Sequence, residues 1–305
     1  TGRSTTEIDQ EFDKKIKEAT EQFQETLKTG LEELVEESKK DVVKTVETNK
    51  REREKSVIEE GIRDHLRGFS RTIPSFLMAY GDNEVTLATF DTVIPDTVFK
   101  EVTSITLEQF RLLRDGGPYP DPETGEEKEF KGNLFDPVVF DDSVKEFLAL
   151  KKKLADYFDE KSVEDIFDYI PPQKTNQIFT PKAMVKKMVD MLEEENPGCF
   201  DLPDKTFIDL YMKSGLYIAE IVKRLYQSDK MKNLYPDKYD RLKHIFEKQV
   251  YGLAPTEIIY KIATSYILGF DEDVKITRHN FKLLDALPYA KNETLKEKLD
   301  EIYGE

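Results

Sequence analysis

The sequence predicts an α+β protein in which a long N-terminal helical region precedes a doubly wound α/β domain. Residues 5–60 contain no proline and one glycine, Gly30, and their apolar positions recur at spacings of three, four and seven residues. Such spacing places the apolar side chains on one stripe of a helix. After residue 170, helical and extended patterns alternate along the chain, as expected of a parallel sheet covered by helices.

The composition favours a chain from a reducing, cytoplasmic compartment. Of the 305 residues, 38% are hydrophobic and 35% are charged, and the single cysteine, Cys199, excludes a disulfide framework. No uninterrupted apolar run of about 18 residues occurs, so we predict no membrane partner. The formal net charge of −16 argues against a simple electrostatic nucleic-acid binder. It leaves open that the chain is one part of a larger DNA enzyme whose basic groove is supplied elsewhere.

Residues 1–60 are predicted to form a long helical arm. Its apolar stripe consists of Ile8, Phe12, Ile16, Phe23, Leu27, Leu31, Leu34, Val35, Val42 and Val46. A stripe of this kind must pack against a second helix or another subunit, which favours a packing arm or a helical hairpin. A DNA clamp is disfavoured because the segment is acidic.

Residues 61–170 are predicted to form a mostly helical spacer domain. Helices are expected over 61–80 with an interruption near Pro74, over 95–114 with Thr106 as N-cap, from Asp141 or Asp142 to Phe158, and from Ser162 to about Tyr169. An alternating pattern predicts an extended segment over 84–91, and 130–140 predicts an extended return. The turn-forming residues of 115–125 predict a surface loop.

Neither a nucleophile triad nor metal-ligand spacing occurs in the sequence. The three histidines, His65, His244 and His279, lie far apart along the chain, and each is expected to be a surface or core residue. We therefore predict no metal site.

Residues 171–305 are predicted to form the α/β domain. Its first helix should begin with Thr180 as N-cap and Pro181 as the first helical residue. Strands are expected over 205–211, 248–253 and 274–277, and helices over 218–225 and 257–268.

The ends of these strands predict one binding crevice. A strand, a tight turn of small residues and a helix N-terminus follow one another around Ser214 and Gly215, an order that favours a carboxylate or phosphate group. Residues just past the three strands should face a common pocket, and these are Asp209, Ser214, Gly215, Ala254, Asn280 and Phe281. The alternative is an ordinary α/β core whose turns bind nothing.

The motifs of this region resemble those of the γ-order N6-adenine DNA methyltransferases, in particular the methylase part of type I, type IIG and type ISP restriction-modification proteins. Phe179-Thr180-Pro181 matches the Phe-Thr-Pro helix start of that family, 209–215 corresponds to its Asp-Pro-x-x-Gly-Ser-Gly turn, and 251–254 corresponds to its Tyr-Gly-x-Glu strand end. The order and spacing agree over roughly residues 173–285. The resemblance implies a Rossmann-like methyltransferase fold with S-adenosylmethionine as cofactor, held by Phe179, Thr180, Pro181, Asp209, Ser214, Gly215, Tyr217, Ala254, Asn280 and Phe281.

Three residues depart from the family pattern. Lys213 replaces the first glycine of the turn, which is tolerable if its φ is not positive and its side chain points away from the cofactor. Ala254 replaces the carboxylate that holds the ribose hydroxyls, and Asn280 stands where an aspartate often contacts the adenine amino group. Each lost charged hydrogen bond weakens cofactor binding by about 1–3 kcal/mol.

The Asn-Pro-Pro-Tyr motif of the family does not occur in the chain. In that motif the Asn accepts hydrogen bonds from the target amine and the Tyr stacks on the flipped base. We therefore expect a fragment, the truncated cofactor-binding part of a methyltransferase, with no catalytic residue and no methyl transfer on its own. DNA and an upstream or partner restriction/helicase module are the partners expected of the full-length protein. The alternative is a non-catalytic helical connector with a degenerate methyltransferase fold.

Overall fold

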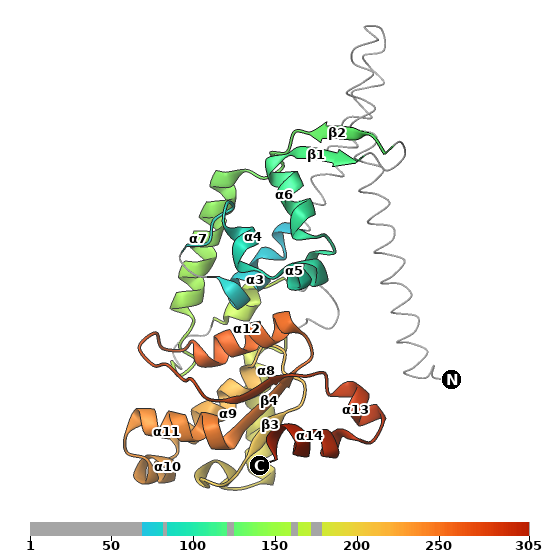
Figure 1. The fold of residues 1–305 in the computed structure, drawn as a ribbon. Coiled ribbons are helices and arrows are strands. Elements are labelled where there is room, and N and C mark those ends of the chain that lie inside the picture. The colour runs from blue at the N-terminus through green and yellow to red at the C-terminus, as the bar shows by residue number, and fades with distance from the viewer. Residues whose placement is uncertain (1–68, 82–83, 121–124, 160–163, 172–178, 305) are drawn as a thin grey trace, which may run out of the picture. The chain divides into compact units, whose positions relative to one another are not determined.

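The computed structural model describes residues 69–81, 84–120, 125–159, 164–171 and 179–304 (Figure 1). The chain divides into two compact units, Thr1–Ser70 and Arg71–Glu305. The predicted arm of residues 1–60 lies outside the described residues. The larger unit contains both helices and strands, which is compatible with an α+β protein. The domain borders predicted at residues 60 and 170 stay predictions.

The first half of the larger unit is helical and surrounds a cluster of phenylalanines. Its elements are α3 (Ile73–Tyr80), α4 (Phe90–Val93), α5 (Asp96–Thr103), α6 (Leu107–Asp115), α7 (Pro137–Lys153) and the 3-10 helix η1 (Ile166–Tyr169). Phe76, Phe90, Phe99 and Phe110 are all at most 1% exposed, and the rings that contact one another have centroids 5.4 to 6.0 Å apart. Burying one such ring contributes roughly 1.5–3 kcal/mol, so this cluster holds α3 to α6 together.

A capping box fixes the start of α6, with Thr106 as the predicted N-cap, although the one helix predicted over 95–114 is the two helices α5 and α6. Thr106 Oγ1 accepts a hydrogen bond from the Gln109 amide at 3.1 Å, and Gln109 Oε1 accepts one from the Thr106 amide at 2.9 Å. Both amides lie at a helix end where no helical partner exists, so the two side chains satisfy them reciprocally.

The start predicted for α7 is wrong. Asp136, and not Asp141 or Asp142, accepts hydrogen bonds from the first amides of the helix, and Pro137 supplies the preset φ of a first helical residue. The helix ends at Lys153 rather than at Phe158. The cap predicted at Ser162 lies outside the described residues.

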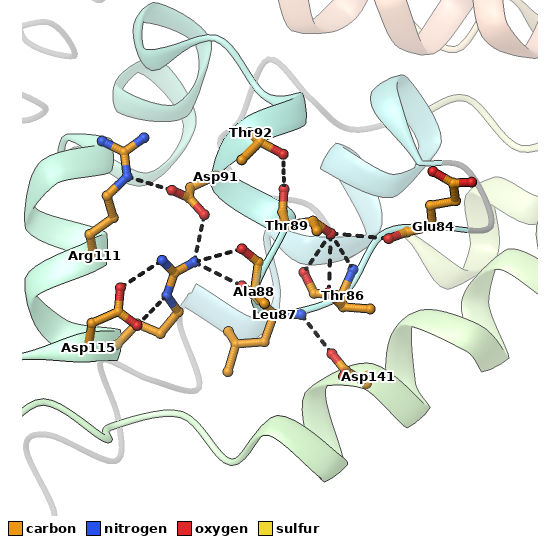
Figure 2. A network of polar contacts seen from close by, with 11 residues as sticks. Glu84, Thr86, Leu87, Ala88, Thr89, Asp91, Thr92, Arg111, Asp115 and Asp141 are labelled. Atoms are coloured by element: carbon orange, nitrogen blue, oxygen red, sulfur yellow. Dashed lines mark hydrogen bonds and ion pairs between the residues drawn. The ribbon is translucent and has the colours of Figure 1, made fainter.

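The extended segment predicted over 84–91 is also wrong, because side chains satisfy the backbone groups that a strand would pair. Figure 2 shows Thr89 Oγ1 accepting from the Thr86 amide at 2.9 Å and Asp141 Oδ1 accepting from the Leu87 amide at 2.6 Å. Arg114 Nη1 donates to the Leu87 carbonyl at 3.0 Å. Such local bonds compete with strand pairing, and the segment forms turns that lead into α4.

Asp91 is the buried centre of the same network. Its carboxylate, 6% exposed, accepts hydrogen bonds from Arg111 Nε at 2.5 Å and from Arg114 Nη1 at 2.6 Å, while Arg114 also pairs with Asp115 at 2.7 Å (Figure 2). Burial by itself raises the pKa of Asp91, but the hydrogen bonds from the two arginines outweigh it and hold the pKa below its ordinary value. The network fixes α4 against α6.

A two-stranded hairpin occupies part of the predicted loop. β1 (Gly117–Pro120) pairs antiparallel with β2 (Glu127–Phe130). Prolines are tolerated in β1 because a strand in a two-stranded ribbon has one edge free of ladder bonds. The extended return predicted over 130–140 is therefore wrong, since β2 ends at Phe130 and α7 begins at Pro137.

The second half of the larger unit is an α/β arrangement around a parallel sheet. Its strands are β3 (Phe207–Asp209), β4 (Val250–Ala254) and β5 (Asn280–Leu283), in the order β3-β4-β5. Its helices are α8 (Lys182–Glu195), α9 (Leu216–Gln227), α10 (Asp229–Leu234), α11 (Lys238–His244), α12 (Glu257–Leu268), α13 (Leu287–Lys291) and α14 (Leu295–Tyr303), with a 3-10 turn at Cys199–Asp201 (η3) and a π-helical segment at Ile245–Gln249 (η4).

The structure confirms one predicted element of this half and contradicts another. The helix predicted over 257–268 is confirmed as α12. The third strand predicted over 274–277 is wrong, because the chain enters the sheet only at Asn280, where the apolar residue Phe281 is 2% exposed and packs on Phe246. Burial of the Phe281 ring, and not the residue pattern of 274–277, therefore decides which segment becomes β5.

Helix α12 is covered by neighbouring elements along its whole length, since none of its residues is exposed to solvent. Its fully buried residues, among them Ile258, Ile259, Ile262, Ala263 and Ile267, lie on one half of the helix, and the residues of the other half are partly buried. It contacts β4 and β5 on one side and α3 on the other, as Figure 1 shows. The Tyr157 hydroxyl donates to the Ile267 carbonyl at 3.0 Å. The helical half and the α/β half therefore share α12 as a common core element.

None of the helices that the structure describes combines the length and the apolarity needed to cross a lipid bilayer.

Candidate functional site

The carboxyl edge is the end of the sheet where β3, β4 and β5 finish, at Asp209, Ala254 and Leu283. In parallel sheets with helical crossovers, ligands bind outside this edge. The turn after β3 is tied to the neighbouring strand, because the Met212 amide donates to the Leu253 carbonyl at 2.7 Å. Asp209 Oδ1 accepts from the Tyr211 amide at 2.9 Å and so fixes the first bend of the turn.

Gly215 ends this turn in a conformation that requires glycine. Its φ is +85°, and a Cβ there would lie 2.8 Å from both Cδ1 and Cγ1 of Ile267 on α12. The Ser214 hydroxyl accepts from the Leu216 amide at 3.3 Å, at the start of α9. Among the described non-glycine residues, positive φ occurs at Ser104, Asn133 and Glu293, so Lys213 meets the first condition for replacing a glycine in the turn.

Asp209 is a half-buried carboxylate without a cation beside it. Burial raises the pKa of Asp209, and the hydrogen bond from the Tyr211 amide opposes the rise only in part. Within the described part of the chain, no lysine or arginine nitrogen forms an ion pair with it. A partly buried anion without a partner is costly, and it is complementary to a positively charged ligand group.

Helix α8 is held along α9 by an arginine clamp. Arg224 of α9 pairs with Asp190 and, at 2.7 Å, with Glu193, both of α8. Nearer the helix starts, the Tyr217 hydroxyl contacts Met188 Sδ at 2.8 Å. Residue numbers rise together along both helices, so α8 and α9 run in the same direction.

The start of α8 therefore extends past the turn. Met188 lies level with Tyr217 in the first turn of α9. The first residue of α8, Lys182, precedes Met188 by six residues, which is about 9 Å of helix at 1.5 Å per residue. The preceding segment, residues 179–181, lies beyond that stretch of α8, on the side of its N-terminus.

The N-cap predicted for α8 is wrong by one residue. Pro181 occupies the cap position, and its carbonyl accepts from the Met184 and Val185 amides, while no side chain caps the helix. The Phe179 ring lies 4.9 Å from the ring of Phe167 in η1. Phe167 in turn lies 4.9 Å from Tyr266 of α12, so Phe179 is fixed by an aromatic row that ends beside Ile267.

The end of β4 offers few polar groups. Ala254 is 0% exposed, and its carbonyl accepts from the Leu284 amide at 2.8 Å. Pro255 has no amide hydrogen, and the Thr256 hydroxyl is buried without a hydrogen-bond partner. At this strand end the structure brings Ala254 close to the turn after β3 but supplies no carboxylate in its place.

Asn280 and Phe281 do not lie at the carboxyl edge, contrary to the prediction. They begin β5, opposite Tyr251 and Gly252 of β4. The Asn280 amide group donates to the Phe246 carbonyl at 3.2 Å and to the Glu247 carbonyl at 2.9 Å, at the opposite end of the sheet. Asn280 thus anchors backbone, and the cause of the error is the misplaced third strand.

Asp285 is the residue that occupies the expected position after β5. It follows Leu283 and Leu284, and it lies close enough to Tyr211 that its negative charge, together with burial, raises the pKa of that tyrosine. The sequence signal was the run Phe281-Lys282-Leu283-Leu284, with three apolar residues of four, directly before an aspartate. The carboxyl edge therefore brings together Asp209, Ser214, Gly215 and Ala254, with Tyr217 beside them on α9 and Asp285 as an addition.

The described residues contain no group of three or more histidine, cysteine, aspartate or glutamate side chains arranged to hold a metal ion. Cys199 is buried, and burial raises the pKa of its thiol, with the charge of Glu193 acting in the same direction.

One comparison with known proteins finds a similar sequence. The chain is 26% identical over 129 residues to a protein of Mycoplasma pneumoniae described as an uncharacterized adenine-specific methylase. The aligned part covers 42% of this chain and 30% of that protein. No protein-family model and no solved structure matches the chain. The chain thus spans less than a third of the length of that protein.

Proposed function

We propose that this chain is the S-adenosylmethionine-binding part of a DNA adenine-N6 methyltransferase that belongs to a restriction-modification system. The observation that carries the proposal is the turn after β3, where a half-buried Asp209 without an ion-pair partner precedes the Gly215 start of α9 at the carboxyl edge of a parallel sheet. The motif resemblance and the similarity to an adenine-specific methylase agree with it.

The polar groups of the turn are complementary to the two charges at the amino-acid end of the cofactor. The amides at the start of α9 have no helical acceptor and favour a carboxylate, while the Asp209 carboxylate favours an ammonium or sulfonium cation. Bound S-adenosylmethionine would supply the methyl group, and this chain would orient it and keep water away from the cation. Phe179, Thr180 and Pro181 would close over it from the start of α8.

Asp285, rather than Asn280, would contact the base of the cofactor. It follows the edge strand β5, two strands away from the turn, and a carboxylate there accepts a hydrogen bond from an adenine amino group with charge assistance. Ala254 leaves the ribose without a carboxylate, so we expect weak binding. The target base, the catalytic motif and the restriction or helicase module would come from outside this chain.

The second candidate is a non-catalytic connector with a degenerate methyltransferase fold. The observation in its favour is the end of β4, where Ala254 and Pro255 offer no ribose contact and the Thr256 hydroxyl is enclosed. Helix α12 contacts both the sheet and α3, and such a shared helix would also be expected in a connector that joins two domains.

Calorimetric titration of the full 305-residue chain with S-adenosylhomocysteine and S-adenosylmethionine separates the two candidates. We expect binding in the micromolar to millimolar range and an affinity at least about fivefold lower for Asp285→Asn, which loses one charge-assisted hydrogen bond worth about 1–3 kcal/mol. Asn280→Ala is the matched control: it lowers thermal stability, but its effect on affinity is smaller. No heat and no thermal shift at millimolar ligand would support the connector, and a larger loss of affinity for Asn280→Ala than for Asp285→Asn would overturn the role given to Asp285.

A further inference from the structure

The two edges of the parallel sheet differ in how they are protected against a further strand. Among the described residues the sheet has the order β3-β4-β5, so β3 and β5 are its edge strands. β3 has three residues and β5 has four, so length does not separate the two edges. Edge strands of natural proteins commonly carry charged residues or prolines that prevent pairing with another chain. The side chains therefore show which edge is closed.

Strand β5 carries such protection and β3 does not. Lys282 lies inside β5 and is exposed, and the Tyr303 hydroxyl of α14 donates to the Asn280 carbonyl of β5 at 2.9 Å. The middle residue of β3 is Ile208, which is β-branched and apolar and is 44% exposed. An apolar β-branched residue at this place is typical of a strand that has a neighbour on both sides.

Helix α8 also exposes apolar side chains in a row. Met184, Met188 and Met191 are 50%, 47% and 51% exposed, and their spacing of four and three residues places them on one face of the helix. The buried residues of α8, Val185 and Val189, lie on a different face. We call Met184, Met188 and Met191 the methionine face. Methionine side chains are flexible and polarizable, so surfaces rich in them adapt to the shape of a partner.

Helix α9 places the methionine face on the same side of the molecule as β3. Tyr217 and Arg224 of α9 contact α8, and the residue after each of them, Ile218 and Leu225, is 0% exposed. One residue is a rotation of about 100° around a helix, so α8 lies on a flank of α9 and not between α9 and the sheet.

The contacts among the elements show which flank α8 occupies. α9 packs on β3 and β4, whereas α12 packs on β4, β5 and α9, so α12 takes the flank of α9 toward β5. α8 packs along α9 and takes the flank toward β3. The helices thus extend one position further than the strands on the side where β3 has its free edge.

We propose that the free edge of β3 and the methionine face together bind one extended segment of the polypeptide that carries the catalytic motif of the methyltransferase. The free edge presents backbone amides and carbonyls that a further strand can pair, and the methionine face would cover apolar side chains on one face of that strand. The choice of this polypeptide rests on the proposed function, in which the catalytic motif comes from outside the chain.

Two observations favour this occupant over a second copy of the chain. The strand pairs of the sheet are parallel, whereas two copies of β3 related by a two-fold axis would run antiparallel. The similar methylase of Mycoplasma pneumoniae continues far beyond its aligned part, which is 30% of its length, so a protein of that kind contains further segments that could supply a strand.

Photo-crosslinking of the full chain in cells of the source organism tests the proposal. Benzoylphenylalanine replaces Ile208 in one variant and Met188 in another, and mass spectrometry identifies the crosslinked products. We expect both positions to crosslink the same polypeptide, and we expect that polypeptide to contain an Asn-Pro-Pro-Tyr motif. The matched controls carry the photo-reactive residue at Lys282, on the protected edge, and at Lys186, on another face of α8. They should give at least about tenfold less product, because neither position faces the free edge.

Two further substitutions test whether the two parts of the surface bind one segment. Ile208→Lys places a charge on the free edge and should lower the product from position 188 at least about fivefold, whereas Lys282→Gln should leave it unchanged. Met191→Glu should lower the product from position 208 in the same way. Ile208 and Met191 are about half exposed, so both variants should fold, and their thermal midpoints verify this.

Three outcomes would overturn the proposal: no product at positions 208 and 188, equal product at positions 208 and 282, or a crosslinked dimer of this chain. Titration with S-adenosylhomocysteine keeps the two proposals distinguishable. Retained binding of S-adenosylhomocysteine without crosslinks would reject the docking surface and leave the proposed function standing. A shared partner of positions 208 and 188 that lacks the motif, together with no nucleoside binding, would reject the proposed function and this choice of partner, and the docking surface would stand.

Discussion

Asp91 in the helical half is buried and Asp209 in the α/β half is half-buried, yet the pKa of the more buried carboxylate is lowered and that of the other is raised. Asp91 receives hydrogen bonds from Arg111 and Arg114, which hold its pKa below the ordinary value (Figure 2). Asp209 receives one backbone amide, and burial raises its pKa. The protein supplies every partner that Asp91 needs and leaves Asp209 incompletely satisfied.

This difference separates a structural charge from a candidate binding charge. A carboxylate with a lowered pKa stabilises the fold at neutral pH, and that contribution is lost as the pH falls through the lowered value. A carboxylate with a raised pKa stabilises the fold only in acid, and that contribution is lost as the pH rises through the raised value. A carboxylate with a raised pKa lowers the stability of the folded chain when it is ionised at neutral pH, and a bound cation can remove that loss. For this reason Asp209 is a candidate binding residue and Asp91 is not.

Asp91→Ala is one of two substitutions with a large expected effect on stability. Loss of the carboxylate leaves Arg114, whose side chain is 14% exposed, without its buried partner, and we expect the free energy of unfolding in urea to fall by about 2–4 kcal/mol. Arg111 is 50% exposed and can turn to water, which limits the cost. The control is Glu272→Gln, which breaks the exposed pair with Lys152 and should cost less than about 1 kcal/mol. Equal losses in the two variants would remove the structural role given to Asp91.

Gly215→Ala tests whether the turn is built as tightly as its surroundings indicate. A Cβ would meet Ile267 at 2.8 Å at a positive φ, and we expect a loss of about 2–4 kcal/mol from the backbone strain and the overpacking together. Gly125→Ala isolates the backbone contribution, since Gly125 has a φ of +71° with nothing within 4 Å of its added Cβ, and it should cost about 1–2 kcal/mol. Thermal and urea unfolding measure both. An equal loss of unfolding free energy in the Gly215 and Gly125 variants would show that Ile267 of α12 does not restrict the size of residue 215.

Asp209→Asn should have the smallest effect on stability and a clear effect on binding. The amide can still accept from the Tyr211 backbone while removing a partly buried charge, so the thermal midpoint at pH 7 should stay the same or rise. Affinity for S-adenosylmethionine should fall at least about tenfold, equivalent to about 1.4 kcal/mol. Asp204→Asn, an exposed residue before the same strand, is the control and should change neither quantity. A drop in the midpoint with unchanged affinity would make Asp209 a structural residue like Asp91.

Local signals in the sequence determined those parts of the fold that depend on neighbours within one turn of helix. The Thr106 capping box and the whole of α12 were predictable because their partners lie three or four residues away. The turn from Asp209 to Gly215 was predictable for the same reason, since one apolar strand, one glycine and one amphipathic helix follow each other directly.

Only the tertiary structure decided the features that depend on distant partners. Segment 84–91 alternates like a strand, yet Asp141 and Arg114 satisfy its backbone and bend it. Which segment becomes β5 depends on the packing of Phe281 against Phe246, a contact between residues 35 positions apart in the sequence. That contact moved Asn280 away from the carboxyl edge and brought Asp285 to it. The sequence pattern shows which residues lie on the same face of an element. Only tertiary packing decides which other element that face contacts.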